Sequence, residues 1–317
     1  MDYYIYNADL PFSGKKIWYK DINSKQQLML TKLDILFPIE NEDYLEYSNI
    51  FNKIISESVE NKEDFYKIDL IEYVLFLTKL RIISIGNDLE LVFKNPENSN
   101  EENTKITIDL NYFIKTLYEN SSELLKDNII KFKDIEIEVG WPSIKSERIF
   151  LNIKENHTEH LLSTIPEYIK NIKIKNSKIL IENFNNEEKI DFYNKLPIKL
   201  RNLIQNKVFE AIKILSEKNL FGISQMDYLK FNFYNKSHQH IIRLLFSENL
   251  INIYQEYYIL ASKNINPSYI DKLTIAERRV YFSFIQEEIK AMNEKNSNNN
   301  NKEFTDLSSL IGEFGEQ

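Results

Sequence analysis

Four histidines are the side chains of this sequence best suited to metal chemistry. They occur in two pairs, His157 with His160 and His238 with His240. In the segment ENHTEH a helix would bring the first pair close to neighbouring glutamates, and imidazole nitrogen with carboxylate oxygen is a donor set that zinc accepts. The alternative, which we favour, is a polar helix start, because neither an HExxH motif nor a convincing fourth ligand accompanies the pair. His238 and His240 lie on different faces of a helix and would meet one ion only on irregular backbone.

Charged residues within the most apolar segment, residues 68–85, are the second candidate for chemistry. Asp69, Glu72 and Arg81 lie there among aliphatic and aromatic side chains. They are either an acid–base pair, or satisfied buried ion pairs and charges at the edge of a helix. We favour the second interpretation because charged residues in protein cores are normally paired. Since charges along the segment make insertion into a bilayer costly, we expect a buried helix and no membrane span.

The run Glu277-Arg278-Arg279 is the third candidate, because adjacent arginines can bind phosphate or an acidic partner. The alternative is structural. Thr274 and Glu277 have the spacing of a capping box, and charged side chains near a helix start commonly pair four residues apart on the solvated face. We favour the structural interpretation.

Several function classes lack the residues that they need. The chain contains no cysteine, which excludes disulfides, thiolate metal sites, iron–sulfur clusters and a cysteine nucleophile. The six glycines form no GxGxxG, GxxxxGK[ST] or GxSxG motif, so phosphate-cradling loops and nucleophile elbows are not expected. A net charge of -8 does not provide the cationic field that nucleic-acid binding needs. The N-terminal segment MDYYIYNADLPF has no basic flank and no apolar core, so we expect no signal peptide.

Residues 1–145 predict helices packed on a small antiparallel sheet. Helical spacing of apolar residues predicts helices over residues 23–36, 42–58, 68–85 and 111–126. Ser24 is the expected N-cap of the first helix. Alternation of apolar and polar residues predicts a hairpin over residues 89–110 and a strand over residues 135–139.

Residues 146–295 predict short β segments followed by a helical region. The segment IFLNI, residues 149–153, is expected to form a strand, and the clearest alternation of the chain lies in residues 172–184. The predicted helices cover residues 158–169, 200–215, 224–234, 237–261 and 274–295. The expected fold class is therefore α+β, mainly helical with small antiparallel sheets and a helical C-terminal half. Residues 296–317 are an Asn-rich linker and an apolar tail peptide.

Four segments together resemble the baseplate hub assembly proteins of T-even-like contractile-tailed bacteriophages. LPFSGKKIWYKDINSKQQLMLTKL (residues 10–33) resembles the family's opening, a strand with Leu, Pro and Ser before a leucine-rich helix. IDLIEYVLFLTKLRIISIGNDLEL (residues 68–91) is similar to its most recognisable stretch, an apolar helix that carries Leu-Arg and ends in Ser-x-Gly. EIEVGWPS (residues 136–143) resembles its strand with a proline turn, and residues 187–212 resemble its helical C-terminal half.

The resemblance implies a structural or assembly component of a phage contractile-tail baseplate, in the hub or inner baseplate, that acts through protein–protein contacts. Its partners would be other baseplate or tail proteins, and its location the virion tail after assembly in the host cytoplasm. The composition also favours a role in protein–protein contacts, because 19 Tyr and 20 Phe supply side chains that anchor protein interfaces. We therefore expect no enzyme and no catalytic, cofactor-binding or metal-ligating residue, and neither nucleic acid nor membrane as partner. A homo-oligomer within a symmetric assembly stays open.

Three alternatives to a structural virion protein also stay open. The first is a tail-assembly chaperone that is absent from the mature virion. The second is a metal-dependent enzyme that uses His157 and His160. The third is a host-side adaptor that binds a helical peptide.

The C-terminal tail is the candidate partner-binding segment. Its large apolar residues recur at helical spacing and would form one stripe: Phe304, Leu307, Leu310, Ile311 and Phe314. The preceding asparagines give a tether, and the apolar residues give burial energy, so the segment has the composition of a docking peptide. The alternative is an exposed chain end without a partner.

Overall fold

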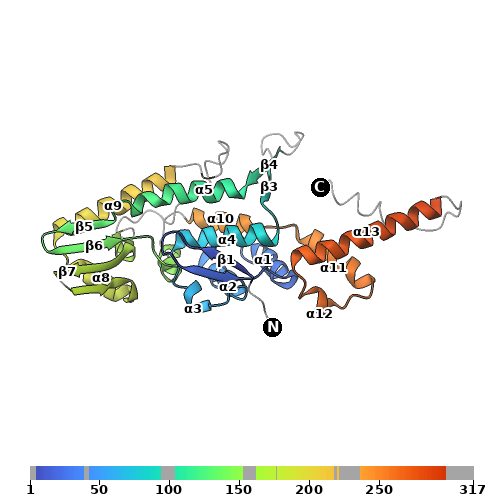
Figure 1. The fold of residues 1–317 in the computed structure, drawn as a ribbon, viewed down its shortest axis with the longest axis horizontal. Helices are drawn as coiled ribbons and strands as arrows, with labels where there is room; N and C mark the ends of the chain where they lie inside the picture. Colours follow the sequence, from blue (N-terminus) through green and yellow to red (C-terminus); the bar gives the residue numbers. More distant parts are fainter. Residues whose placement is uncertain are drawn as a thin grey trace.

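The computed structural model of the protein describes residues 5–38, 43–93, 104–152, 162–175, 177–217, 220 and 236–297. Within these ranges helices dominate, and three small antiparallel sheets accompany them. The molecule is elongated, and its last helices project from the remainder (Figure 1). We call residues 5–246 the body and residues 250–297 the arm. The expected α+β class, with small antiparallel sheets and a helical C-terminal half, is confirmed.

The chain begins with a hairpin followed by helices. These elements are β1 (Tyr6–Asp9), β2 (Lys16–Tyr19), α1 (Ser24–Leu36), α2 (Tyr44–Ser56), α3 (Lys62–Phe65) and α4 (Leu70–Ser84). Asn23 caps α1, because its extended backbone directs its side chain to the N–H of Gln26, which caps Asn23 in return. The expectation that Ser24 is the N-cap is therefore wrong. The buried Ser24 hydroxyl instead donates to the Leu273 carbonyl, 2.9 Å away in the arm.

Helix α4 is the centre of the body, as its apolar sequence predicted. Every residue from Leu70 to Thr78 is buried, and so are Leu80 and Arg81. Two helices pack on it, α5 (Leu110–Ser121) and α10 (Ser237–Phe246). A helix that is apolar on all sides requires such cover. The chain leaves the end of α4 through Gly86, whose φ of +139° is a conformation that favours glycine.

The predicted hairpin is present as β3 (Asp88–Phe93) paired antiparallel with β4 (Thr104–Asp109). The polar residues expected at its tip lie outside the described residues. Helix α5 follows directly, and a 3-10 turn, η2 (Ser122–Leu125), extends it. The prediction of a helix over residues 111–126 is thus confirmed, and each of its ends differs from the observed end by one residue.

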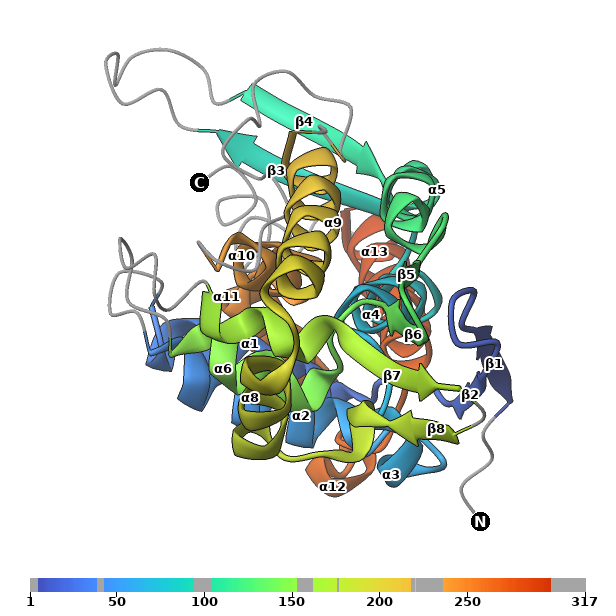
Figure 2. The same cartoon turned by 90° about the vertical axis from the view of Figure 1, so that its left-hand side faces the viewer.

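A four-stranded antiparallel sheet lies at the end of the body opposite the arm (Figures 1 and 2). Its strands, in spatial order, are β5 (Ile129–Phe132), β6 (Ile135–Val139), β7 (Ile169–Ile174) and β8 (Ser177–Leu180). The alternating patterns of residues 135–139 and 172–184 predicted strands at both places. The predicted boundary between residues 145 and 146 falls between β6 and β7, so the two predicted units share this sheet.

The strand expected over residues 149–153 is wrong. The structure instead has a 3-10 turn, η3 (Ile144–Ser146), that continues into α6 (Glu147–Leu151). Ile144, Glu147, Phe150 and Leu151 are all buried, and their spacing is helical. Of the helix expected over residues 158–169, the described part ends in a 3-10 turn, η4 (Ile165–Tyr168), and Ile169 already belongs to β7.

The C-terminal half is helical. After a 3-10 turn, η5 (Ile181–Asn183), it contains α8 (Asn186–Lys195), α9 (Ile198–Glu217), α10, α11 (Leu250–Ser262), α12 (Pro267–Ile270) and α13 (Ile275–Ser297). The single helix expected over residues 237–261 is two helices, because Asn249 caps the start of α11. The capping box of Thr274 and Glu277 is confirmed at the start of α13. The helix expected over residues 224–234 lies outside the described residues.

The body has one continuous apolar core. It extends along the sequence from Ala8 to Phe246, receives Ile275 from the start of α13 in the arm, and includes fully buried large side chains such as Trp141, Tyr73, Phe76, Phe113 and Phe150. Helix α9 lies alongside α5 and closes one side of it (Figure 2). The arm has a separate small core: Ile259, Leu260, Ile270 and Ile285.

No helix in the described ranges is both long enough and apolar enough to cross a membrane.

Candidate functional site

The histidines do not form a metal site in the described part of the chain. His157 and His160 lie outside it. On α10, the buried Nε2 of His238 lies 3.4 Å from Glu147 Oε1, whereas Nε2 of His240 is 3.1 Å from the Tyr44 hydroxyl. The two side chains thus have different surroundings, as their spacing predicted. Burial, followed by the charges of Arg243 and His238, lowers the pKa of His240. Among the described residues, no group of three or more His, Asp or Glu is placed to hold a metal ion.

Glu147 is the centre of a buried polar network that joins four helices. Its Oε2 accepts a hydrogen bond of 2.5 Å from the Ser48 hydroxyl of α2, and its Oε1 accepts one of 2.6 Å from Gln239 of α10. The Tyr73 hydroxyl of α4 donates to Asn52, which donates in turn to Ser48. Since these groups are buried and bonded to one another, the network positions the helices.

The expected buried ion pair is found at Asp69, whereas the partners that the structure shows for Glu72 and Arg81 are mainly backbone groups. Glu72 accepts hydrogen bonds of 2.8 Å from the backbone N–H groups of Phe12 and Ser13, so it holds the turn between β1 and β2. Arg81 donates to the Gly86 carbonyl at 2.7 Å. These contacts join two segments that carry the family resemblance, because residues 12 and 13 meet the start of α4 at Glu72, and the Ile22 N–H donates to the Ser84 hydroxyl at its end. Asp69 belongs to a pocket described below.

The arginines at the start of α13 bind other parts of this chain. Arg278 is 1% exposed, and its Nε lies 2.7 Å from Glu256 Oε2 of α11. Its Nη2 donates to Gln27 of α1 at 2.6 Å. Arg279 donates to the Ile85 carbonyl at 3.2 Å. The structural interpretation is correct for the capping box of Thr274 and Glu277. Arg278, however, forms its ion pair with a residue of another helix and not with one on α13. These arginines fasten the arm to the body.

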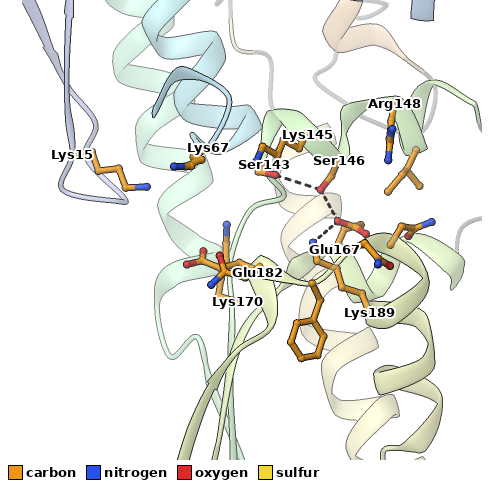
Figure 3. Close-up of a pocket in the computed structure, with 15 residues that line it drawn as sticks. Lys15, Lys67, Ser143, Lys145, Ser146, Arg148, Glu167, Lys170, Glu182 and Lys189 are labelled. Atoms are coloured by element: carbon orange, nitrogen blue, oxygen red, sulfur yellow. Dashed lines mark hydrogen bonds and ion pairs between the residues drawn. The ribbon is translucent and has the colours of Figure 1, made fainter. Parts of the chain in front are cut away.

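A pocket of about 400 Å³ lies where the first hairpin, α3, α6, β7 and α8 come together (Figure 3). Basic side chains are its shared feature: Lys15, Lys67, Lys145, Arg148, Lys170 and Lys189. We call it the cationic pocket. Its basic residues come from widely separated segments, so no local motif in the sequence indicated it.

Two of the six cations are neutralised inside the wall of the cationic pocket. Lys189 Nζ lies 2.7 Å from Glu167 Oε2, which also accepts a hydrogen bond of 2.5 Å from Ser146 (Figure 3). Lys170 Nζ lies 2.5 Å from Asp69 Oδ1. Burial raises the pKa of Asp69 to about 6, although the charge of Lys170 and its hydrogen bond act in the opposite direction. These pairs connect β7 to α4 and α8 to η4.

The other four cations line the mouth of the pocket and are exposed. Lys15, Lys145 and Arg148 form no ion pair with the residues that the structure describes. Lys67 lies 3.9 Å from Glu63, and both side chains are largely exposed. Such surface pairs contribute little free energy. Glu182 is the remaining acidic residue in the lining. The mouth therefore carries an excess of positive charge on a protein whose net charge is -8.

The arm presents exposed apolar side chains. On α11, Ile251, Tyr254 and Tyr258 are 59%, 46% and 73% exposed. On α13, Val280 and Phe284 are 51% and 62% exposed. We call these five the exposed arm residues. Their helical spacing was visible in the sequence, but only the structure distinguishes them from core residues. The tail residues proposed for docking lie outside the described residues.

Comparison with known proteins gives one family. The family model for the T4 bacteriophage base plate protein matches residues 1–219. The curated proteins and the solved structures gave no match. Because the match covers well over half of the chain, the protein belongs to the T4 bacteriophage base plate protein family. It therefore has a structural role in the phage baseplate, lies in the virion tail and contacts other tail or baseplate proteins. The matched region ends after α9, and the arm lies beyond it.

Proposed function

We propose that this member of the T4 base plate protein family is a non-enzymatic component of the hub or inner baseplate that acts through protein–protein contacts. The observation that carries the proposal is the set of exposed arm residues on a projecting pair of helices (Figure 1). Large apolar side chains gathered on an exposed surface mark interaction sites, and tyrosine is favoured at the centres of interfaces.

The arm is built to hold this surface in place. Its own small core packs α11 against α13, and Arg278 joins both helices to α1. Tyr257 and Phe282 pack against this core, whereas the exposed rings of Tyr258 and Phe284 are not among the residues that form it. Because the family model matches residues 1–219, which belong to the body, and the arm lies beyond the match, contacts shared by the family would involve the body. The arm would add a contact of this protein's own.

The C-terminal tail is the second contact that we propose. Helix α13 ends at Ser297, and six residues separate it from Phe304. The stripe of Phe304, Leu307, Leu310, Ile311 and Phe314 would dock in an apolar groove of another baseplate protein. A helix of this length is marginal alone in water, so it would fold on its partner.

Co-purification with baseplate components tests the proposal. Deleting residues 303–317 should leave the melting temperature nearly unchanged and weaken co-purification. A double variant of the arm, Tyr258→Ser with Phe284→Ser, should weaken it as well. The matched control is Tyr112→Ser with Ile198→Ser, which removes exposed apolar side chains of the body. Full co-purification with both the deletion and the arm variant would contradict the proposal. A large loss of melting temperature on deletion would assign the tail to this protein's own core.

Mass spectrometry separates a resident component from an assembly chaperone. Purified virions and tail-assembly intermediates from one lysate would be compared. We expect the protein in both samples. Its presence in the intermediates alone would make it a tail-assembly chaperone, which acts in the host cytoplasm and leaves the finished virion.

A further inference from the structure

We propose that the cationic pocket binds an acidic peptide segment of another protein, with two or more Asp or Glu side chains. The inference rests on the proposed function, because the segment would belong to a baseplate partner. It concerns the face made by the first hairpin, α3, α6, β7 and α8, which is separate from the arm (Figures 1 and 3).

The volume and shape of the cavity suit a side-chain-sized ligand. A volume of about 400 Å³ lies within the range of pockets that hold ligands in proteins. Its walls are fixed by the two buried ion pairs, Lys189 with Glu167 and Lys170 with Asp69. The Asp69 backbone also bridges to Ser143 at the pocket rim. The site is thus formed before a ligand arrives.

The unpaired positive charges of the cationic pocket indicate that its ligand is an anion. Lys15, Lys145 and Arg148 have no acidic partner among the described residues, although they surround one cavity. Like charges placed around a cavity repel one another, and an anion between them removes that cost. Arg148 in addition can bind a carboxylate through two parallel N–H groups.

The uncharged and acidic parts of the lining favour a peptide over a polyphosphate. Glu182 lies in the wall, and the net charge of -8 repels an extended polyanion such as nucleic acid. Asn183, Asn185 and Asn186 offer amide groups that can hydrogen-bond a peptide backbone, and Phe184 offers an apolar surface. A segment of alternating acidic and small residues satisfies all of these groups.

Fluorescence anisotropy on the purified full-length protein tests the inference. The probe is a dye-labelled octapeptide of alternating Glu and Ala, and its matched control replaces every Glu by Gln. We expect the Glu peptide to bind, the Gln peptide not to bind, and added salt to weaken the interaction. Charge reversal by Lys145→Glu with Arg148→Glu should weaken binding about tenfold or more, which corresponds to about 1.4 kcal/mol. The milder pair Lys145→Gln with Arg148→Gln covers the case in which charge reversal disturbs folding.

A second double variant controls for net charge. Lys199→Glu with Lys290→Glu reverses two exposed cations that lie outside the pocket and should leave peptide binding unchanged. Equal binding by the wild type and both pocket variants would overturn the proposal, and so would stronger binding of a short DNA duplex than of the Glu peptide. The assay contains no other baseplate protein. If the wild type does not bind the Glu peptide but still co-purifies with baseplate components, only the pocket proposal is overturned. If the wild type binds the peptide but arm and tail variants co-purify at full strength, only the proposed function is overturned.

Discussion

The body and the arm are held together by different kinds of contact. The body buries a continuous core with fully enclosed side chains such as Trp141, Phe76 and Phe113. The described part of the arm buries seven apolar residues, and four of them, Ile259, Leu260, Ile270 and Ile285, form a small core of its own. It is joined to the body through Ile275, which is buried in the core of the body, and through directed polar contacts, from Arg278 to Gln27 and from Ser24 to the Leu273 carbonyl. The body thus obtains its stability from burial, whereas the arm obtains its orientation from a few named side chains.

The difference between the two regions matters for function. A surface whose aromatic residues are not required for its own core can present them to a partner without loss of the fold. The body also exposes single aromatic residues such as Tyr112, but Tyr73 and Phe113 are buried in its core. The two regions can therefore be separated by mutation, and the following predictions do so in order of decreasing effect.

Removing core volume from the body should have the largest effect. Leu80 is fully buried in α4, so Leu80→Ala should lower the free energy of unfolding by about 2–5 kcal/mol, through lost burial and the cavity left behind. Leu75→Ala in the same helix should behave alike. Denaturant titration measures the change. The control is Leu36→Ala at a 68% exposed position of α1, which should be nearly neutral. An unchanged stability together with lost partner binding would show that this face of α4 is an interface.

Breaking the junction should release the arm and leave the body folded. Arg278→Ala leaves Glu256 and Gln27 without their partner, and removing one member of a buried ion pair costs about 3 kcal/mol. We expect faster hydrogen exchange in residues 273–278 and little change in the melting of the body. Lys290→Ala, at an exposed position of the same helix, is the control. If the free energy of unfolding of the whole protein instead fell by about 3 kcal/mol, the arm would be part of the body's cooperative unit.

The partly buried carboxylate of Asp34 in the body should lower stability when it is ionised. At the junction, in contrast, the charge of Arg278 is paired and stabilises the structure. Burial raises the pKa of Asp34 to about 6, against the opposing effects of the Tyr47 hydrogen bond and the charge of Arg243. A carboxyl whose pKa is raised by folding contributes stability below its ordinary pKa, and this contribution is lost as the pH rises through about 6. Asp34→Asn does not titrate and can still accept the Tyr47 hydrogen bond.

The stability of Asp34→Asn relative to wild type should therefore increase between about pH 4 and pH 7, by on the order of 1 kcal/mol because the carboxylate is partly solvated. Melting temperatures across this range measure the difference. Asp191→Asn, which removes an exposed carboxylate, should show no such trend. A difference that is constant with pH would contradict a raised pKa for Asp34.

Periodicity and capping signals in the sequence were sufficient for most of the fold. The all-round apolar pattern of residues 68–85 located α4, and alternation located β3, β4, β6, β7 and β8. The pattern failed at residues 149–153, because a short apolar run does not distinguish a strand from one helical turn. The burial of Ile144, Glu147 and Phe150 at intervals of three became visible only in the structure, because Glu147 is a charged residue. The break between α10 and α11, in contrast, was marked by Asn249, a favoured N-cap residue.

The candidate site was much less accessible to prediction from sequence. Lys15, Lys67, Lys145 and Lys189 lie far apart in the chain and become neighbours only through tertiary packing. An abundance of lysine gives no means of selecting these four. The sequence did predict that the charges on α4 would be satisfied, but it could not show that Glu72 binds the backbone of a turn 60 positions earlier.

The contact between α1 and the arm also relates the order of synthesis to the finished surface. Ser24 and the carbonyl that it binds are 249 positions apart, so α1 leaves the ribosome long before its partner exists. The body can collect most of its core while the chain is still growing, whereas the arm can take its place only when translation is nearly complete. A prematurely ended chain would carry the body without an oriented arm.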